Sequence, residues 1–274
     1  MKKTRQAGLI GCVLASLTTA AVADTEDVPP VTDAPDGQFS VMRGLQSPKG
    51  MFSARLQLAI SLSDGAVGEP ISIVPDLYYG VTDKLQLGLT HSGGMGWQSP
   101  PGLGLCLTGE DSGCPEVYDN IGFDLMYGLL FDKLHLSAHG SVFINSFDPN
   151  STSLALGFAG KAHFSDRVAL LFDPKIALEV SDRDAFDDII YVPLDLDIQA
   201  GRKTVVKLLT GVYGGIDHFG DFYRIPVGLG VVQNLNKHFD LGARFSFDNL
   251  LGNQPEGVGA ADERSAVVLL NVRS

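Results

Sequence analysis

The sequence is short of positive charge and of long apolar runs. It has 20 lysines and arginines against 32 aspartates and glutamates, for a formal net charge of -12. Proteins that bind duplex nucleic acid present clustered basic side chains, so we expect no nucleic-acid partner. After residue 23, no uninterrupted apolar stretch approaches the roughly 18 residues that a membrane-spanning helix needs. If the mature chain crosses a membrane, a closed β-barrel is the other structure that satisfies its backbone in lipid.

Motifs for catalysis and for metal binding are also lacking. His135 and His139 would share one strand face but lie about 13 Å apart, which is too far to hold one ion. The acidic segment 181–188 lacks the spacing and the glycine of an EF-hand loop. Ser141 follows His139 on the same strand face, yet no nucleophile motif surrounds it. We therefore predict no catalytic residue, no metal site and no cofactor, and hence a protein that is not an enzyme.

The N-terminus and the cysteines both indicate an exported protein. A basic start (MKKTR), an apolar stretch over 7–17 and the small-residue run AVA over 21–23 are the three parts of a signal peptide, which we place at 1–23. Cleavage there removes Cys12 and leaves Cys106 and Cys114. An even pair of cysteines in an oxidising compartment predicts a disulfide between them.

The mature sequence changes character at Gly50. Residues 24–49 are rich in proline and aspartate and have no sustained period, which indicates a flexible arm and a candidate plug. Over 50–274, segments of about ten residues alternate apolar with small or polar side chains, as strands with one apolar face do. We predict about twelve such strands, an even number that lets both termini lie on the same, periplasmic side. They cover 51–62, 71–81, 85–90, 121–131, 134–145, 153–164, 168–180, 189–199, 204–214, 223–232, 239–248 and 264–273.

The links between these strands alternate between short and long, as periplasmic turns and extracellular loops do. The long ones are 63–69, 93–120, 146–152, 181–188, 215–222 and 249–263. Aromatic residues of a membrane interface are expected on the apolar face near strand ends. Those beside the short turns are Tyr79, Tyr127, Phe131, Phe164 and Phe239. The pattern predicts an all-β protein: a transmembrane, antiparallel up-and-down barrel in a bacterial outer membrane, in contact with its lipids and lipopolysaccharide.

A repeated hairpin unit carries a family resemblance. It reads YGVTDKLQLGLTHSG and is echoed by AHFSDRVALLFD and QNLNKHFDLGARFSF. The unit resembles outer-membrane barrels grouped with phenol-degradation meta-pathway transporters and related porin-like families, as a hairpin style over Met51 to Ser274. The resemblance implies a channel or uptake protein for small molecules. The chain departs from the common barrel pattern at its end, VVLLNVRS, where an aromatic residue usually stands, and this weakens the assembly signal.

If the apolar face meets lipid, the other face lines the lumen and is the candidate site. We assign as pore-lining Arg55, Asp76, His139, Asp173, Lys175, Glu179, Asp195, Asp197, Arg224 and Arg244. The arginines belong to strands near the point of closure, and most of the acidic residues to the facing arc. Such an arrangement either sets up a transverse field that orients dipolar solutes or lets the charges pair and fill the barrel. Asp76 and Lys175, which lie in the arcs of opposite sign, favour pairing.

Twelve strands lie between the eight that leave room for side chains alone and the 16 to 18 that enclose an aqueous channel. We therefore predict an outer-membrane channel or uptake protein for small polar or aromatic solutes, with a narrow charged lumen. The alternative is a non-conducting structural or surface-interaction barrel that acts through its extracellular loops, above all 93–120. The sequence leaves the solute, the gating and the oligomeric state open.

Overall fold

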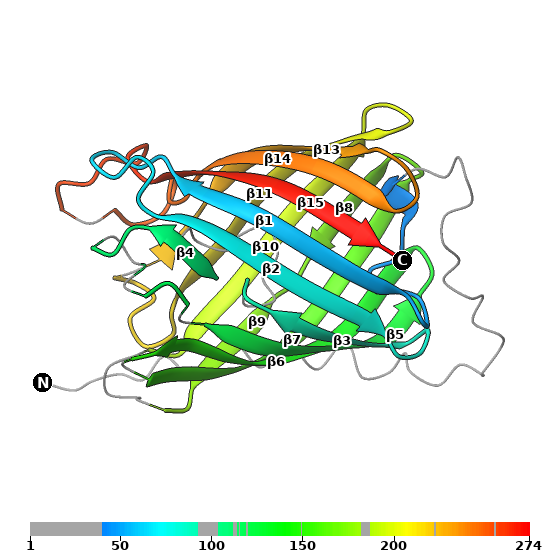
Figure 1. Cartoon of the computed structure of the whole chain (residues 1–274), viewed down its shortest axis with the longest axis horizontal. Helices are drawn as coiled ribbons and strands as arrows, with labels where there is room; N and C mark the ends of the chain where they lie inside the picture. The colour runs from blue at the N-terminus through cyan, green and yellow to red at the C-terminus, as the bar shows by residue number, and fades with distance from the viewer. Residues whose placement is uncertain are drawn as a thin grey trace, which may run out of the picture. The chain divides into compact units, whose positions relative to one another are not determined.

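The computed structural model describes residues 40–92, 104–111, 114, 116–118, 120–148, 150–181, 187–221, 223–254 and 256–274. Within these ranges the chain forms the predicted closed, antiparallel barrel of twelve strands (Figure 1). A 3-10 turn, η1 (Ser40–Met42), precedes it. None of the described residues forms a helix long and apolar enough to cross a membrane. The predicted signal peptide 1–23 and residues 24–39 lie outside the described residues.

The wall strands follow one another around the ring in chain order. They are β1 (Phe52–Ser61), β2 (Ile71–Gly80), β3 (Leu85–Thr90), β5 (Ile121–Phe131), β6 (Leu134–Phe147), β7 (Asn150–Ser165), β8 (Val168–Phe172) with β9 (Lys175–Glu179), β10 (Ile189–Gln199), β11 (Thr204–Gly215), β12 (Tyr223–Arg224) with β13 (Val227–Asn234), β14 (Phe239–Phe247) and β15 (Arg264–Arg273). Pairing of β1 with β15, from Ser53↔Arg273 to Ser61↔Ser265, joins the first strand to the last.

The alternation of the sequence decides which side chains point outward. On β1, Leu56 is 45% exposed, whereas the next residue, Gln57, is 4% exposed. The same alternation of exposed and buried positions runs through β5 and β14. Tyr79, Tyr127 and Phe164 are exposed on the outer face near the short turns. The barrel is therefore apolar outside and polar inside, the reverse of a water-soluble barrel.

Two prolines interrupt wall strands. Pro174 lies between β8 and β9, and Pro226 lies between β12 and β13. Each of them lies at a break between two strand segments, where it has no N–H to donate to a neighbouring strand. The expected continuous segments 168–180 and 223–232 are accordingly split in two, although each still fills one position in the ring.

The predicted loop 93–120 contains a strand that sequence reasoning missed. Within it, β4 (Leu105–Thr108) pairs with residues 71–73 of β2. The neighbouring strand β3 pairs with residues 77–80 of β2 and ends at Thr90, so β4 replaces it as the partner of β2 at the long-loop end. Four residues are too few to show an alternation, which explains why 93–120 was expected to be irregular throughout.

Residues 40–49 pack into the barrel at the end of the short turns, where η1 lies (Figure 1). Val41 is 1% exposed and packs against Ala169, Val205 and Val232 on the inner faces of β8, β11 and β13. The side-chain amide of Gln46 donates to backbone carbonyls at the β2–β3 turn and on β5, at 3.0 and 3.2 Å. This segment therefore contacts two separate parts of the inner wall at the same mouth.

Candidate functional site

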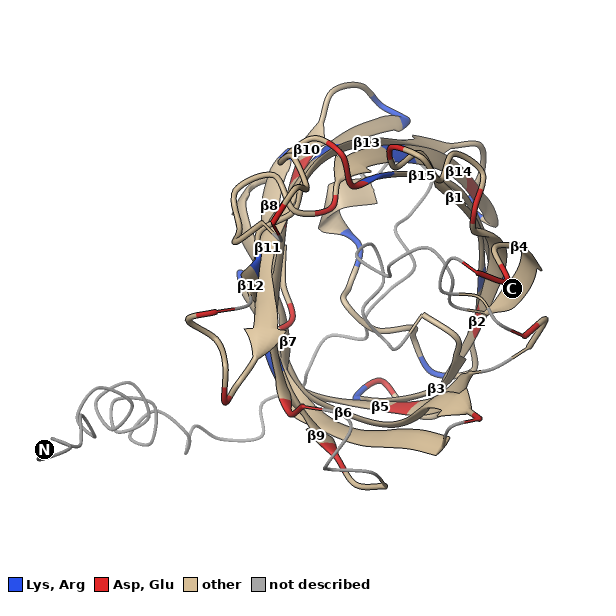
Figure 2. Cartoon of the chain, turned by 90° about the vertical axis from the view of Figure 1, so that its left-hand side faces the viewer, with Lys and Arg blue, Asp and Glu red and all other residues tan. Residues whose placement is uncertain are grey.

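Charged residues occur all round the ring of strands. Figure 2, which views the barrel from the left-hand side of Figure 1, shows acidic and basic positions along the wall. Buried among the predicted pore-lining residues are Asp76, His139, Lys175, Glu179, Asp195, Asp197 and Arg244; partly exposed are Arg55, Asp173 and Arg224. Since a buried charge is costly unless it is paired or hydrogen-bonded, the partners of these side chains decide what the wall can do.

His139 on β6 bridges two carboxylates. Its Nε2 lies 2.5 Å from Oδ2 of Asp124 on β5, and its Nδ1 lies 2.8 Å from Oδ1 of Asp173. Ionised carboxylates only accept hydrogen bonds, so with both carboxylates ionised the two ring nitrogens are donors and the imidazole carries a positive charge. The second oxygen of Asp173, Oδ2, lies 2.9 Å from Nζ of Lys175. These four side chains, which we call the His139 network, alternate in charge along the wall and sum to neutrality.

Ser141 and His139 do not form a nucleophile–base pair. Both side chains are buried on the inner face of β6. Both ring nitrogens of His139 are already hydrogen-bonded to carboxylates, and Ser141 Oγ has no hydrogen-bond partner among the described residues. A general base needs a nitrogen within reach of the hydroxyl whose proton it takes. This geometry therefore does not support hydrolytic chemistry at Ser141.

Lys207 on β11 pairs with the two aspartates of β10. Its Nζ lies 2.6 Å from Asp197 Oδ1 and 3.7 Å from Asp195 Oδ2. The other oxygen of Asp195, Oδ1, has no hydrogen-bond partner among the described residues, although the residue is only 7% exposed. Two carboxylates therefore share one ammonium group, and Asp195 is the more distant of the two from it.

Arg55 and Asp76 are opposite each other in the pairing of β1 with β2, yet they have different partners. Asp76 accepts hydrogen bonds from the backbone N–H groups of His91 and Ser92, at 2.8 and 3.1 Å. The Arg55 guanidinium lies over the ring of Tyr78, 5.8 Å from its centroid. Asp76 thus fixes the chain beyond β3, while Arg55 remains a partly exposed cation on the inner wall.

Two further predicted residues, Arg224 and Glu179, lie toward the long-loop end. Arg224 Nη1 lies 3.1 Å from Glu263 Oε2, and its guanidinium lies over the Tyr213 ring at 5.9 Å. Glu179 accepts a hydrogen bond from the Ser151 hydroxyl at 2.9 Å. The acidic and basic residues placed here by the alternation are therefore held by partners from neighbouring strands and loops.

Arg244 on β14 is buried and interacts electrostatically with Asp248 and with Asp195. Asp248, just beyond the end of β14, accepts hydrogen bonds from the hydroxyls of Ser246 and Ser265 at 2.9 and 2.8 Å. Burial raises the pKa of the Asp248 carboxyl above its ordinary value, against the opposing effect of these two hydroxyls and of Arg244. Two acidic groups therefore act electrostatically on Arg244.

Sequence reasoning missed the ion pairs at the short-turn mouth. Arg43 Nη1 lies 2.9 Å from Oδ2 of Asp240 on β14, and Arg273 Nη1 lies 2.5 Å from the same oxygen. Nζ of Lys161 donates to the Arg43 carbonyl at 2.9 Å. Arg43 belongs to the segment without a period, which the sequence marks as a candidate plug without indicating which of its side chains contact the wall.

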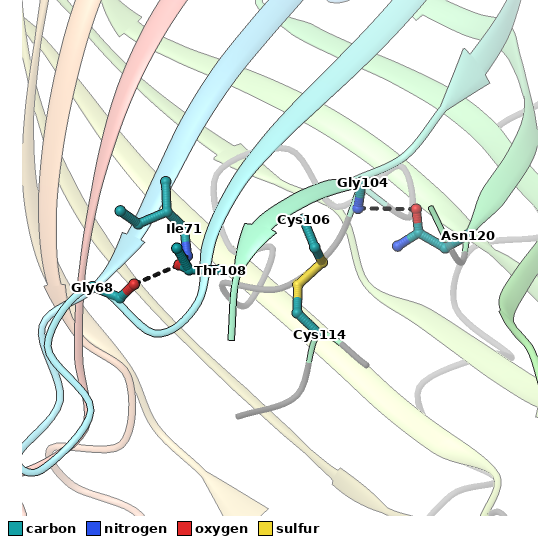
Figure 3. The surroundings of a disulfide bond; sticks show 7 residues. All are labelled: Gly68, Ile71, Gly104, Cys106, Thr108, Cys114 and Asn120. Carbon is teal, nitrogen blue, oxygen red and sulfur yellow. Dashed lines mark hydrogen bonds between the residues drawn. A yellow bond between two sulfur atoms is a disulfide. The ribbon is translucent and has the colours of Figure 1, made fainter. Parts of the chain in front are cut away.

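The predicted disulfide Cys106–Cys114 is present, with a Cα–Cα distance of 5.9 Å. It joins β4 to the segment that follows it (Figure 3). Nearby, the Gly104 N–H donates to Asn120 Oδ1 at 3.0 Å, and the Thr108 hydroxyl donates to the Gly68 carbonyl at 2.6 Å (Figure 3). These contacts hold β4 between the loop after β1 and the start of β5.

Comparison with solved structures finds the same fold among outer-membrane barrels. The NanC porin superposes with a TM-score of 0.55 at 6% identity, over 81% of this chain and 98% of that one. The KdgM porin in complex with disordered oligogalacturonate gives 0.51 at 7%, over 81% and 98%. An outer membrane channel from Pseudomonas putida F1 gives 0.54 at 15%, over 83% and 97%.

At these identities the likeness concerns the fold alone. No protein-family model matches the sequence, and no curated protein matches it either. The predicted resemblance to outer-membrane, porin-like barrels is therefore confirmed at the level of fold, and the narrower relationship to phenol-degradation transporters is not confirmed.

Proposed function

We propose that this protein is an outer-membrane channel for small solutes. The observation that carries the proposal is a closed ring of strands whose outer face is apolar and exposed and whose inner face is charged and buried. A closed ring satisfies every backbone group in lipid, and an apolar band on its exterior is what a bilayer requires. Membrane lipids and lipopolysaccharide are then the partners of the outer face, and the solute is the partner of the inner one.

The passage is narrow in this proposal. A ring of twelve strands encloses less space than the 16 to 18 strands of general porins. Residues 40–49 also contact β5 on one side of the mouth and β8, β11 and β13 on the other. We therefore assign residues 40–49 a plugging role at the short-turn mouth, which favours selective passage of small solutes over general diffusion.

The transverse field in this proposal is weaker than the sequence predicts, because part of the charge on the inner wall is paired. Lys175 and Lys207 offset much of the acidic arc, so the field rests on the residues that pairing leaves least neutralised. On the acidic side this is Asp195, and on the basic side Arg55. A field of this kind orients dipolar solutes and penalises those that cannot exchange their hydration for wall groups.

Refolding in detergent followed by planar-bilayer recording tests the channel proposal. A closed barrel migrates differently on a gel with and without boiling, and a channel then gives discrete current steps. Asp195→Lys should shift the reversal potential toward anion selectivity, because it replaces a wall carboxylate with an ammonium group. Ser137→Ala, which changes a buried, uncharged inner-wall residue, is the control.

A heat-modifiable barrel that carries no current would overturn the channel proposal in favour of a structural or surface-interaction barrel. In that case deletion within 93–120 should abolish binding to the outer surface while the barrel stays folded. A conducting Asp195→Lys variant with unchanged selectivity would remove the field and leave the channel.

A further inference from the structure

Arg55 stands out among the inner-wall cations by the kind of partner it has. Among the described residues, no carboxylate forms an ion pair with its guanidinium. Its contact is the face of the Tyr78 ring, and the side chain is partly exposed. A guanidinium held over a ring keeps its N–H edge directed away from the ring, where it can donate two parallel hydrogen bonds to a carboxylate.

Asp195 stands out among the inner-wall anions. Lys207 Nζ lies 2.6 Å from Asp197 Oδ1 but 3.7 Å from Asp195 Oδ2, so its ion pair with Asp197 is the closer of the two. Asp195 Oδ1 is buried without a hydrogen-bond partner among the described residues. A buried carboxylate oxygen of this kind is costly unless a donor is supplied, and a bound solute or water supplies one.

The two residues face each other across the interior. In the ring order, β10, which carries Asp195, is separated from β1, which carries Arg55, by β11, β13, β14 and β15. Both side chains lie on the inner face of the wall, Asp195 buried and Arg55 partly exposed. An anion with an oxygen that lacks a hydrogen-bond partner and a cation without an ion-pair partner therefore face the same lumen.

We infer, on the basis of the proposed channel function, that the space between Arg55 and Asp195 is a binding subsite for small zwitterions of the α-amino-acid class. The solute carboxylate accepts from the Arg55 guanidinium, and the solute ammonium donates to Asp195 Oδ1. A simple anion of the same size meets repulsion from Asp195, and a simple cation meets repulsion from Arg55 and Arg244. Both ends of a zwitterion find the opposite charge.

Uptake of labelled L-alanine into proteoliposomes tests this subsite, with bilayer current recorded on the same preparations. Lactate, isopropylammonium and lactamide serve as anionic, cationic and uncharged competitors of similar size. L-alanine uptake should saturate and be inhibited more strongly by unlabelled L-alanine than by any of the three. Arg55→Gln and Asp195→Asn should each raise the half-saturating concentration about tenfold, since each removes one charged hydrogen-bonded contact.

Ser137→Ala is the control, because it changes a buried, uncharged residue of the inner wall; its half-saturating concentration should stay unchanged. Current steps together with L-alanine uptake that neither saturates nor exceeds that of lactamide would overturn the subsite and leave the channel standing. Absence of both current and uptake would overturn the channel and the subsite together. If Arg55→Gln does not refold, the ranking of the four probes on the wild-type protein decides the matter in the same way.

Discussion

Apart from Asp195, the charged side chains on the inner faces of β5, β6, β10 and β11 are held in ion pairs, whereas the inner face of β1 presents an arginine over an aromatic ring. On the first arc, His139 lies between Asp124 and Asp173, and Lys207 lies against Asp197. On the second, Arg55 contacts Tyr78. The same alternation placed all of these side chains inside. The difference therefore lies in which side chains the neighbouring strands place beside them.

This difference separates two roles for lumen charge. A charge that is paired within the wall contributes to stability and little to the field in the lumen. A charge that lacks an ionic partner contributes little to stability and is available to a solute. Substitution of a paired charge should therefore lower stability more than it changes selectivity. Substitution of a charge without an ionic partner should change selectivity more than it lowers stability.

The largest loss of stability is expected for His139→Leu. This change leaves Asp124 and Asp173 without the cation between them, and breaking a buried ion pair from one side costs about 3–5 kcal/mol. The free energy of unfolding in urea, measured on detergent-refolded protein, reports it. Ser137→Ala on the same strand face is the control, and equal stability of the two variants would contradict the role of the His139 network.

Lys207→Met should come next, with a loss of about 3 kcal/mol, because it leaves two buried aspartates without their shared ammonium. It should also shift the reversal potential toward cations. A stable variant with unchanged selectivity would mean that Lys207 neither stabilises the two aspartates nor offsets their charge in the lumen.

Arg43→Ala should cost less, about 1 kcal/mol, because its side chain is 26% exposed and Asp240 keeps a second ionic partner in Arg273. Urea unfolding measures this loss beside that of Lys207→Met. A loss as large as that of Lys207→Met would show that the short-turn mouth is held by Arg43 rather than by shared contacts.

The smallest loss of stability is expected for Arg55→Gln, about 0.5 kcal/mol, since the contact removed is a partly exposed cation–ring pair. Its reversal potential should still shift toward cations. A strong loss of stability without a shift in selectivity would reverse the distinction between the two arcs.

The candidate site could be predicted from the sequence only as a set of inward positions. Alternation along β6 placed His139 on the inner face, but its two partners are 15 and 34 residues away in the chain. Arg43 and β4 gave no periodic signal at all, the first because its segment has no period and the second because it is four residues long. Such contacts become visible only when distant strands lie side by side.

The number of wall strands and the face on which each side chain lies follow from local alternation, because a period of two residues is a local property of an extended chain. Which charges are neutralised depends instead on how the strands pack. Pairing between strands fixes which residues from distant segments come within a few ångströms, and a hydrogen bond or ion pair depends on that distance. Arg55 and His139 show the same alternation in the sequence, yet one contacts a ring and the other bridges two carboxylates.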